Sequence, residues 1–147
     1  MKILRLLLVS GLCSLITAQN LRADEGPVLT VEVKNILLAK GNLMVGIFNN
    51  AGTFTKEELP ESPMVPVKET GVISVEVKGL KAGKYAVVVF QDFNENGKLD
   101  KNFLGMPKEP YAFSNDPEIS RSAPKFSDCT FELEAEGTSL SLTLSGK

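Results

Sequence analysis

Oxygen-bearing side chains occupy alternate positions along one short stretch of this chain, and they point to the chemistry of a hard cation. Calcium takes its ligands from carboxylate, amide and backbone carbonyl oxygens, which a short loop supplies at every second position. A glycine, here Gly97, follows where the backbone of such a loop turns sharply. We therefore predict a calcium-binding loop with the ligands Asp92, Asn94, Asn96, the backbone carbonyl of Lys98, and Asp100.

The stretch differs from an EF-hand in two ways. The twelfth position of an EF-hand loop carries a bidentate Glu, and Phe103 stands there in this chain. A Val-rich segment typical of a strand leads into the loop, where an EF-hand has a helix. About five oxygens fall short of the six to eight that calcium prefers, so we expect weak, structural binding, with a dissociation constant of roughly 10⁻⁴ to 10⁻³ M. Water or an acid would complete the shell; Glu109 is the possible additional ligand, with Asp116 and Asp128 as alternatives.

A metal-free interpretation uses the same residues. Asn and Asp side chains accept backbone amide protons in Asx turns, and Asn96-Gly97 is by itself a strong turn dipeptide. A turn requires fewer such residues than the four oxygen-bearing side chains that follow the ligand spacing here. Calcium is therefore the prediction, and an Asx-rich turn is the alternative.

The amino-acid composition excludes several classes of enzyme. The chain contains no histidine, which excludes Ser-His and Cys-His machinery and His-based zinc sites. Asp100 and Glu109 form the one carboxylate pair considered for a hydrolase of glycosidic bonds. Acids beside a calcium loop are more often ligands or solvated charges, so we predict no catalytic residue and no enzyme.

The N-terminus predicts export. A basic segment at residues 1–5 precedes the apolar run Leu6–Ile16, which is too short to span a bilayer, and the small residue Ala18 follows. We predict a signal peptide over residues 1–18, cleaved after Ala18, with Ala23 as a second cleavage site and a retained anchor as the alternative. The mature protein is expected to be secreted or periplasmic, without a transmembrane span.

Cleavage there would remove two of the 16 basic residues and none of the 18 acidic ones, leaving a net charge of −4. Nothing resembles a basic stripe for phosphates, so no nucleic-acid partner is expected. An envelope protein or a glycan is a possible partner.

Hydrophobic residues recur mostly with a period of two, which is typical of strands with one exposed face. Residues 29–34, 73–78 and 139–144 have this pattern, whereas 43–48 and 85–90 are apolar on both faces and indicate central strands. We predict an all-β fold: one antiparallel β-sandwich domain of about seven strands, immunoglobulin- or transthyretin-like. It would span residues 28–145, after a flexible segment at 19–27.

Other segments carry smaller predictions. Residues 101–128, rich in proline, are expected to form a long irregular loop, and residues 55–58 one helical turn. A tight hairpin is expected just before Tyr85. Cys129 is expected on the buried face of a strand, as a small hydrophobe rather than a reactive thiol. Phe103, Tyr111 and Phe113 are an alternative ligand surface or, more simply, anchors of the loop.

Motifs spread over most of the chain carry a resemblance to a known family: residues 82–87, the 92–100 loop, Phe103-Leu104-Gly105-Met106-Pro107, Glu109, Tyr111-Ala112-Phe113-Ser114-Asn115 and Pro124-Lys125-Phe126-Ser127-Asp128. Together they resemble the bacterial domain of unknown function (DUF) family 2141. The resemblance covers about residues 41–144 and implies a secreted or periplasmic single-domain β protein with no established activity. The chain departs from the pattern at Gln91, where His is implied, and at Ala112, where Gly is implied.

The predicted function is a non-catalytic binding or interaction module with a weak structural calcium site. The alternative is a module that binds carbohydrate or another small ligand through the aromatic residues between Phe103 and Phe113. A carboxylate-dependent hydrolase is the less favoured possibility.

Overall fold

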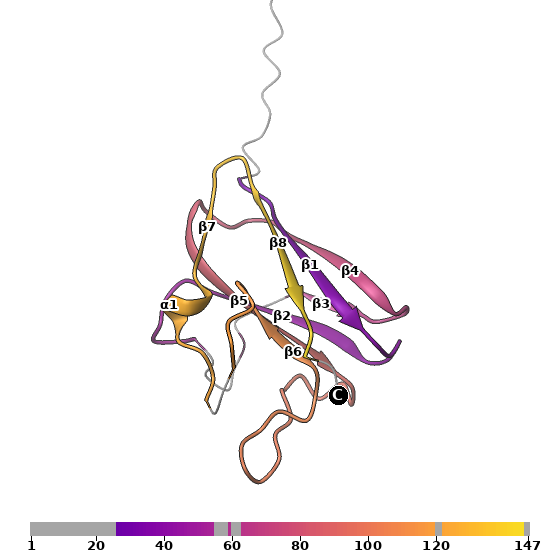
Figure 1. Cartoon of the computed structure of the whole chain (residues 1–147). Helices are drawn as coiled ribbons and strands as arrows, with labels where there is room; N and C mark the ends of the chain where they lie inside the picture. Colours follow the sequence, from indigo (N-terminus) through magenta and orange to yellow (C-terminus); the bar gives the residue numbers. More distant parts are fainter. Residues whose placement is uncertain (1–25, 55–58, 60–62, 120–121, 146–147) are drawn as a thin grey trace, which may run out of the picture.

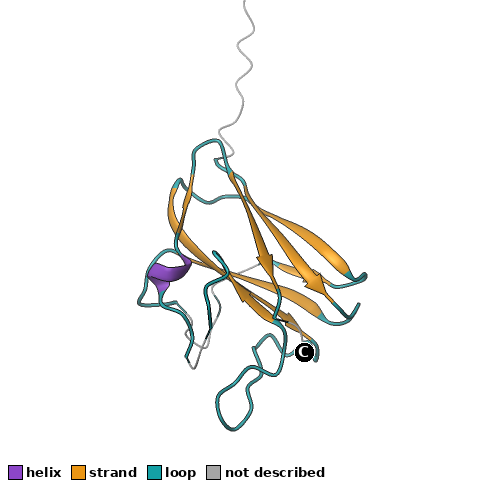
Figure 2. Ribbon diagram, viewed as in Figure 1, coloured by secondary structure: helices purple, strands orange, loops and turns teal. Residues whose placement is uncertain are grey.

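The computed structural model describes residues 26–54, 59, 63–119 and 122–145. Within these residues the fold is almost entirely β, with eight strands in two sheets and a single short helix (Figures 1 and 2). The all-β sandwich prediction is confirmed. In chain order the elements are β1 (Leu29–Ile36), β2 (Asn42–Phe48), β3 (Met64–Pro66), β4 (Gly71–Val77), β5 (Gly83–Asp92), β6 (Tyr111–Phe113), α1 (Phe126–Cys129), β7 (Phe131–Leu133) and β8 (Thr138–Thr143).

The two sheets differ in size and in the direction of their strands. One has the order β4-β1-β8, and the other has the order β3-β2-β5-β6, with β7 also paired to β5. Every strand pair in the described residues is antiparallel except β1–β8, which is parallel. The expectation of a purely antiparallel sandwich is corrected here. A parallel pair needs a long crossover connection, and the remainder of the domain provides it.

Alternation along β1 and β8 produces the main core. Leu29, Val31 and Val33 of β1 are fully buried, and so is Leu142 of β8, while the residues between them face outward. On the second sheet, Val45 of β2 and its neighbours on β5 complete the same cluster. The strands with a period of two therefore bury one face each, as predicted.

The second sheet also buries its other face, beneath a smaller aromatic cluster. Ala86 and Val88 of β5 pack there with Phe48, Phe54 and Phe113. The rings of Phe48 and Phe54 meet edge to face at 5.5 Å between centroids. Residues 43–48 and 85–90 were predicted to lie in central strands covered on both sides, and the two clusters confirm this.

Two local predictions are wrong. The connection before β5 is not a hairpin, because β4 belongs to one sheet and β5 to the other. Cys129 ends α1 rather than standing on a strand, although its burial is confirmed. Helix α1 forms where the Asp128 carboxylate accepts the Lys125 amide at 3.0 Å and the Thr130 hydroxyl donates to the Phe126 carbonyl at 2.7 Å.

The segment at 101–128 is more ordered than expected. It contains β6, the start of α1 and an isolated bridge between Lys101 and Pro107. The predicted signal peptide and the predicted helical turn at 55–58 lie outside the described residues. In the part of the chain that is described, no helix is long and apolar enough to span a membrane.

Candidate functional site

Asp92 ends strand β5 and organises the turn that follows. Its side chain is 1 % exposed, and each of its carboxylate oxygens accepts one backbone amide. Oδ1 accepts the amide of Asn96 at 3.2 Å, and Oδ2 accepts that of Gly97 at 2.7 Å. Gly97 has a φ of +74°, in the left-handed region that favours glycine. One buried carboxylate therefore sets the curvature of the loop.

The other polar side chains of the loop gather around Asp100. Its two carboxylate oxygens accept the side-chain amides of Asn94 at 2.8 Å and Asn96 at 3.1 Å. The amide oxygen of Asn94 accepts the backbone N–H of Asn96 at 3.3 Å, and that of Asn96 accepts the backbone N–H of Lys98 at 2.9 Å. The predicted ligand side chains thus lie together in one hydrogen-bonded group, linked by Asx turns.

This donor set has the oxygen chemistry that calcium prefers. A carboxylate offers about four acceptor positions, so Asp92 keeps lone pairs after accepting two amides. At Asp100 a cation would compete with the amide groups of Asn94 and Asn96. Across the described residues, no group of three or more His, Cys, Asp or Glu side chains is placed to hold a metal ion. Calcium would therefore rely on the asparagine amides as well as on the two acids.

Glu109 connects the two ends of the loop. It is 6 % exposed, and its Oε1 accepts the backbone amide of Phe93 at 2.8 Å. Its Oε2 accepts the backbone amide of Asp100 at 3.1 Å. Both oxygens of Glu109 therefore accept amides of the loop, from Phe93 and Asp100, which are seven positions apart in the sequence. The sequence suggested Glu109 as an extra cation ligand or, with Asp100, as half of a carboxylate pair; its role as the acceptor that closes the loop depends on the tertiary fold.

A small hairpin follows directly from the Asp92–Asp100 loop. Its base is the bridge between Lys101 and Pro107, reinforced by the amide of Lys108, which donates to the carbonyl of Asp100 at 2.8 Å. Within it, Asn102 accepts through its side-chain oxygen from the backbone amides of Leu104 at 2.9 Å and Met106 at 3.0 Å. Asn102 is not among the site residues predicted from the sequence. The only available signal was an Asn within a Gly- and Pro-containing stretch, which is typical of many turns.

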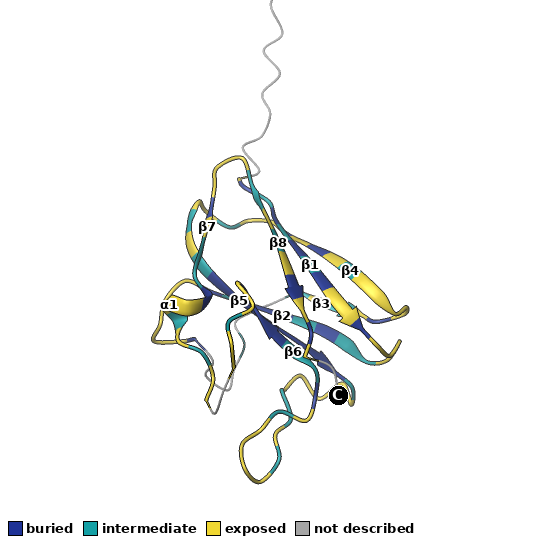
Figure 3. Ribbon diagram, viewed as in Figure 1, coloured by how far each residue is buried: buried dark blue, intermediate teal, exposed yellow. Residues whose placement is uncertain are grey.

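The tip of this hairpin is apolar and faces solvent. Phe103 is 95 % exposed, Leu104 72 % and Met106 43 %. The segment between β5 and β6 extends away from both sheets at the bottom of Figure 1, and Figure 3 colours most of it as exposed. We call Phe103, Leu104 and Met106 the apolar tip.

The turn between β1 and β2 packs against the end of β5, beside the loop. The buried side chain of Gln91 donates through Nε2 to the carbonyl oxygens of Leu38 at 2.8 Å and Lys40 at 2.7 Å. A Cβ on Gly41 would lie 1.9 Å from the carbonyl oxygen of Asp92. Gln91 therefore fixes the neighbouring turn through two hydrogen bonds.

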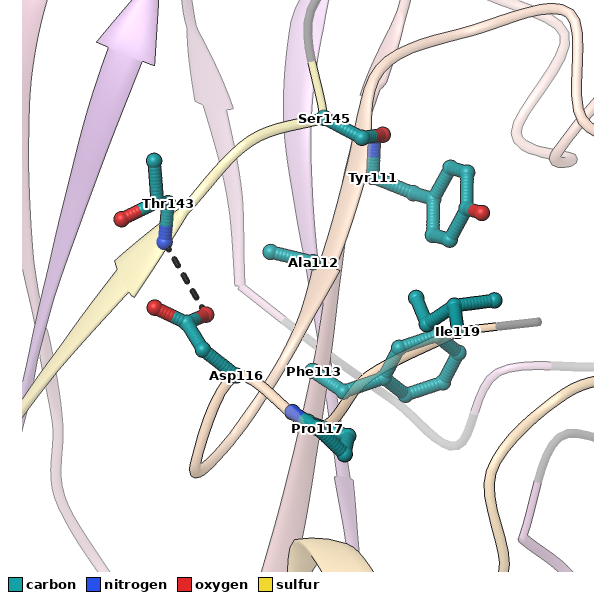
Figure 4. Close-up of a pocket in the computed structure, with 8 residues that line it drawn as sticks. All are labelled: Tyr111, Ala112, Phe113, Asp116, Pro117, Ile119, Thr143 and Ser145. Atoms are coloured by element: carbon teal, nitrogen blue, oxygen red, sulfur yellow. Dashed lines mark hydrogen bonds between the residues drawn. The ribbon is translucent and has the colours of Figure 1, made fainter.

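The aromatic residues considered as a ligand surface are separated. Phe103 lies at the exposed tip, while Phe113 is buried and contacts Tyr111 edge to face at 5.9 Å between centroids. A pocket of about 220 Å³ does adjoin Tyr111 and Phe113 (Figure 4), and on its wall the Asp116 carboxylate accepts the backbone amide of Thr143 at 3.2 Å. Its lining consists of Tyr111, Ala112, Phe113, Asp116, Pro117, Ile119, Thr143 and Ser145.

Two small side chains near β6 have structural roles. Ser114 is fully buried, accepts the amide of Val87 at 2.9 Å and donates to the carbonyl of Cys129. Burial raises the pKa of the Cys129 thiol to about 11, and the Asp128 carboxylate adds to the rise. The thiolate is the reactive form of cysteine, so Cys129 is inert at neutral pH.

Comparison with known proteins identifies one similarity. A family model described as "Uncharacterized protein conserved in bacteria (DUF2141)" matches residues 31–141. The match spans the sandwich from β1 into β8 and includes the whole segment between β5 and β6. Neither the curated proteins nor the solved structures compared with the chain gave a match.

Proposed function

The chain belongs to the bacterial family described as "Uncharacterized protein conserved in bacteria (DUF2141)", and from its loop geometry we propose that it is a non-catalytic binding module. The module acts after export, as a secreted or periplasmic protein. Its binding surface is the apolar tip of the hairpin between β5 and β6.

The exposure of the tip on an internally bonded hairpin is the observation that carries this proposal. A soluble domain gains free energy by burying large apolar side chains, and the sandwich buries most of its own. Phe103 is instead almost fully exposed, and the adjacent Leu104 is largely exposed. Clustered apolar side chains on a surface are typical of interaction sites. The hydrogen bonds of Asn102 and Glu109 hold the tip in place before it meets a partner, which lowers the entropy cost of binding.

Site-specific photo-crosslinking in the cell tests this proposal. A photo-reactive amino acid at position 104 is expected to give adducts of increased mass. The matched control is position 64, where Met64 of β3 is also exposed. Adducts from position 104 but not from position 64 would support the proposal. Equal labelling from both positions, or neither a protein nor a lipid adduct from 104, contradicts it.

The second part of the proposal is that calcium stabilises the loop between Asp92 and Asp100. The gathered carboxylates and amides support this, because their oxygens are the ligands that calcium prefers. Calcium at ten times its dissociation constant would add about 1.4 kcal/mol to the free energy of unfolding. The ion is thus a stabiliser of the hairpin base and takes no part in a reaction.

Thermal unfolding in calcium and in chelator tests this second part. We expect calcium to raise the Tm of the wild-type protein and to have no effect on Asp92→Ala or Asp100→Ala. Glu95→Gln is the matched control, because Glu95 is an exposed acid of the same loop that makes no hydrogen bond to Asp92 or Asp100 among those described. Identical melting curves in calcium and chelator for the wild type would remove the calcium site.

A small-ligand module is the second candidate function, and the pocket beside Tyr111 favours it. Asp116, Thr143 and Ser145 bring polar groups to a wall that also carries an aromatic ring (Figure 4). Its volume of about 220 Å³ is below the roughly 300 Å³ at which sites for drug-sized ligands begin. A single sugar or a similar fragment would be the largest occupant. A glycan array with wild type and Tyr111→Ala tests this candidate, and signals that do not depend on Tyr111 count against it.

The geometry gives a hydrolase no support. Both oxygens of Glu109 accept backbone amides within the loop, and both oxygens of Asp100 accept asparagine amides. A general acid and its partner must instead face the bond that breaks. In the described part of the chain these two acids serve the loop itself.

A further inference from the structure

We propose that the apolar tip docks on an anionic lipid surface, with Phe103, Leu104 and Met106 entering the boundary between headgroups and acyl chains. This inference rests on the proposed function, because it assigns a partner to the same surface. Three observations carry it: the exposure of the tip, the internal hydrogen bonding of its backbone, and the charges at its base.

The tip presents apolar side chains on a protruding hairpin. Exposures of 95 % at Phe103 and 72 % at Leu104 mean that these side chains lose little contact with the protein when they enter another medium. Insertion of a few such side chains into the interfacial region is favourable in proportion to the apolar area transferred. The pocket beside Tyr111 lies elsewhere, against β6 and β8, and the segment that carries the tip extends away from both sheets (Figure 1), a shape suited to a penetrable surface.

Backbone amides of the tip form hydrogen bonds within the hairpin, so they need fewer water molecules as partners. The amides of Leu104 and Met106 donate to the side chain of Asn102. The amide of Gly105 donates to the carbonyl of Asn102 at 2.9 Å, and that of Asn102 to the carbonyl of Met106 at 2.8 Å. An unpaired backbone amide costs several kcal/mol in hydrocarbon. These internal bonds remove much of that cost.

Lysines flank the base of the hairpin. Lys101 is exposed in the bridge that closes the hairpin, Lys108 is exposed directly after the other bridge residue, Pro107, and Lys98 is exposed in the preceding loop. The same segment holds three acids: Glu109 is buried, Asp100 is half-buried, and the oxygens of both accept amides. Glu95 is the one acid of the segment that is exposed, against these three exposed lysines. The one ion pair found in the described part of the chain joins Lys34 and Glu32 on β1, so none involves these three lysines. Positive side chains around an apolar tip match the charge of an anionic membrane.

Vesicle co-sedimentation of the processed protein tests the inference. The probes are vesicles of phosphatidylglycerol with phosphatidylcholine and vesicles of phosphatidylcholine alone. We expect binding to the first and much weaker binding to the second. Phe103→Ser combined with Leu104→Ser should weaken binding about tenfold or more, because the inserted area is lost. Lys101→Gln and Lys108→Gln should each weaken it about fivefold, and high salt should act in the same direction.

Met64→Ser is the matched control, since Met64 is an exposed apolar residue on β3, outside the hairpin. Its binding should equal that of the wild type. All variants share the same N-terminus, so differences between them report on the substituted residues. A second variant, Asn102→Ala, leaves the apolar side chains in place while removing an acceptor of two tip amides. It should also bind more weakly, and Asn102→Asp, which keeps the acceptor, should bind better than Asn102→Ala.

The outcomes separate the two proposals. Binding to anionic vesicles that requires Phe103 and Leu104 supports a lipid partner. No vesicle binding, together with protein adducts from position 104 in the cell, overturns the lipid partner and keeps the binding module. Vesicle binding that survives the double substitution overturns the assignment to the tip. Absence of both vesicle binding and adducts overturns both proposals.

Discussion

The sandwich and the segment between β5 and β6 bury different kinds of atoms. Between the sheets, the fully buried positions carry branched aliphatic side chains such as Leu29, Val89 and Leu142. In the segment after β5, the buried side chain is the carboxylate of Glu109, which joins that of Asp92 at the strand end, while the apolar side chains of the tip face solvent. The usual relation of apolar inside and polar outside is thus reversed over a short stretch of chain.

The two kinds of buried side chain differ in how strictly each fixes the position of the backbone around it. A buried leucine stabilises the fold in proportion to its area, with little demand on direction. A carboxylate that accepts two amides fixes two points of the backbone at defined distances and angles. Glu109 and Asp92 each do this, so two side chains shape a loop that has no core of its own. The reversal leaves the apolar tip available for a partner.

The largest expected effect comes from the core. Leu142→Ala removes a fully buried side chain from between the sheets and should lower the free energy of unfolding by about 2–5 kcal/mol. Leu104→Ala makes the same change at the exposed tip and should stay within about 0.5 kcal/mol of wild type. Urea unfolding measures both. Equal losses from the two substitutions would contradict the contrast between the regions.

The second effect tests the contact between the β1–β2 turn and the end of β5. Gly41→Ala places a Cβ 1.9 Å from the Asp92 carbonyl at a φ of +67°, so we expect a loss of about 2 kcal/mol or more. Gly97→Ala has a similar φ of +74° and nothing within 4 Å, and should cost only about 1 kcal/mol. The difference between the two Tm values isolates the steric contact. Similar values would indicate that the turn moves aside.

The third effect is confined to the loop. Glu109→Ala leaves the amides of Phe93 and Asp100 without their acceptor, at a cost of about 1–3 kcal/mol. Glu109→Gln keeps one acceptor oxygen and should lose less. Hydrogen exchange should accelerate at these two amides and remain slow at Val31 and Val89 in the core. Uniform acceleration throughout the domain would show that the loop and the sandwich unfold together.

The smallest expected effect is on how the free energy of unfolding depends on pH. The folded pKa of Cys129, about 11, is above the ordinary value of 9.0. A thiol with a raised pKa contributes stability that is complete below pH 9 and is lost as the pH rises through 11. The free energy of unfolding should therefore fall more steeply over this range for wild type than for Cys129→Ala. Parallel curves would mean that the thiol ionises equally easily in the folded and unfolded states.

The strands were predictable because their signal is local. Alternation at 29–34, 73–78 and 139–144 and continuous apolar runs at 43–48 and 85–90 correspond to β1, β4, β8, β2 and β5. Apolar residues at every second position indicate which face of a strand is buried, and this signal does not depend on the element that packs against that face. The predicted hairpin before β5 failed because the choice of partner strand is not local. The chain crosses there from one sheet to the other.

The sequence by itself determined the strands, their buried faces and the oxygen-rich spacing from Asp92 to Asp100, because each depends on residues close together along the chain. Only the tertiary structure decided that β8 pairs in parallel with β1 and that Glu109 closes the loop. It also decided that the apolar tip remains in solvent, since Phe103 and Leu104 read from sequence alone could equally have joined a core. Burial is a property of what surrounds a residue, and the sandwich places nothing over this hairpin.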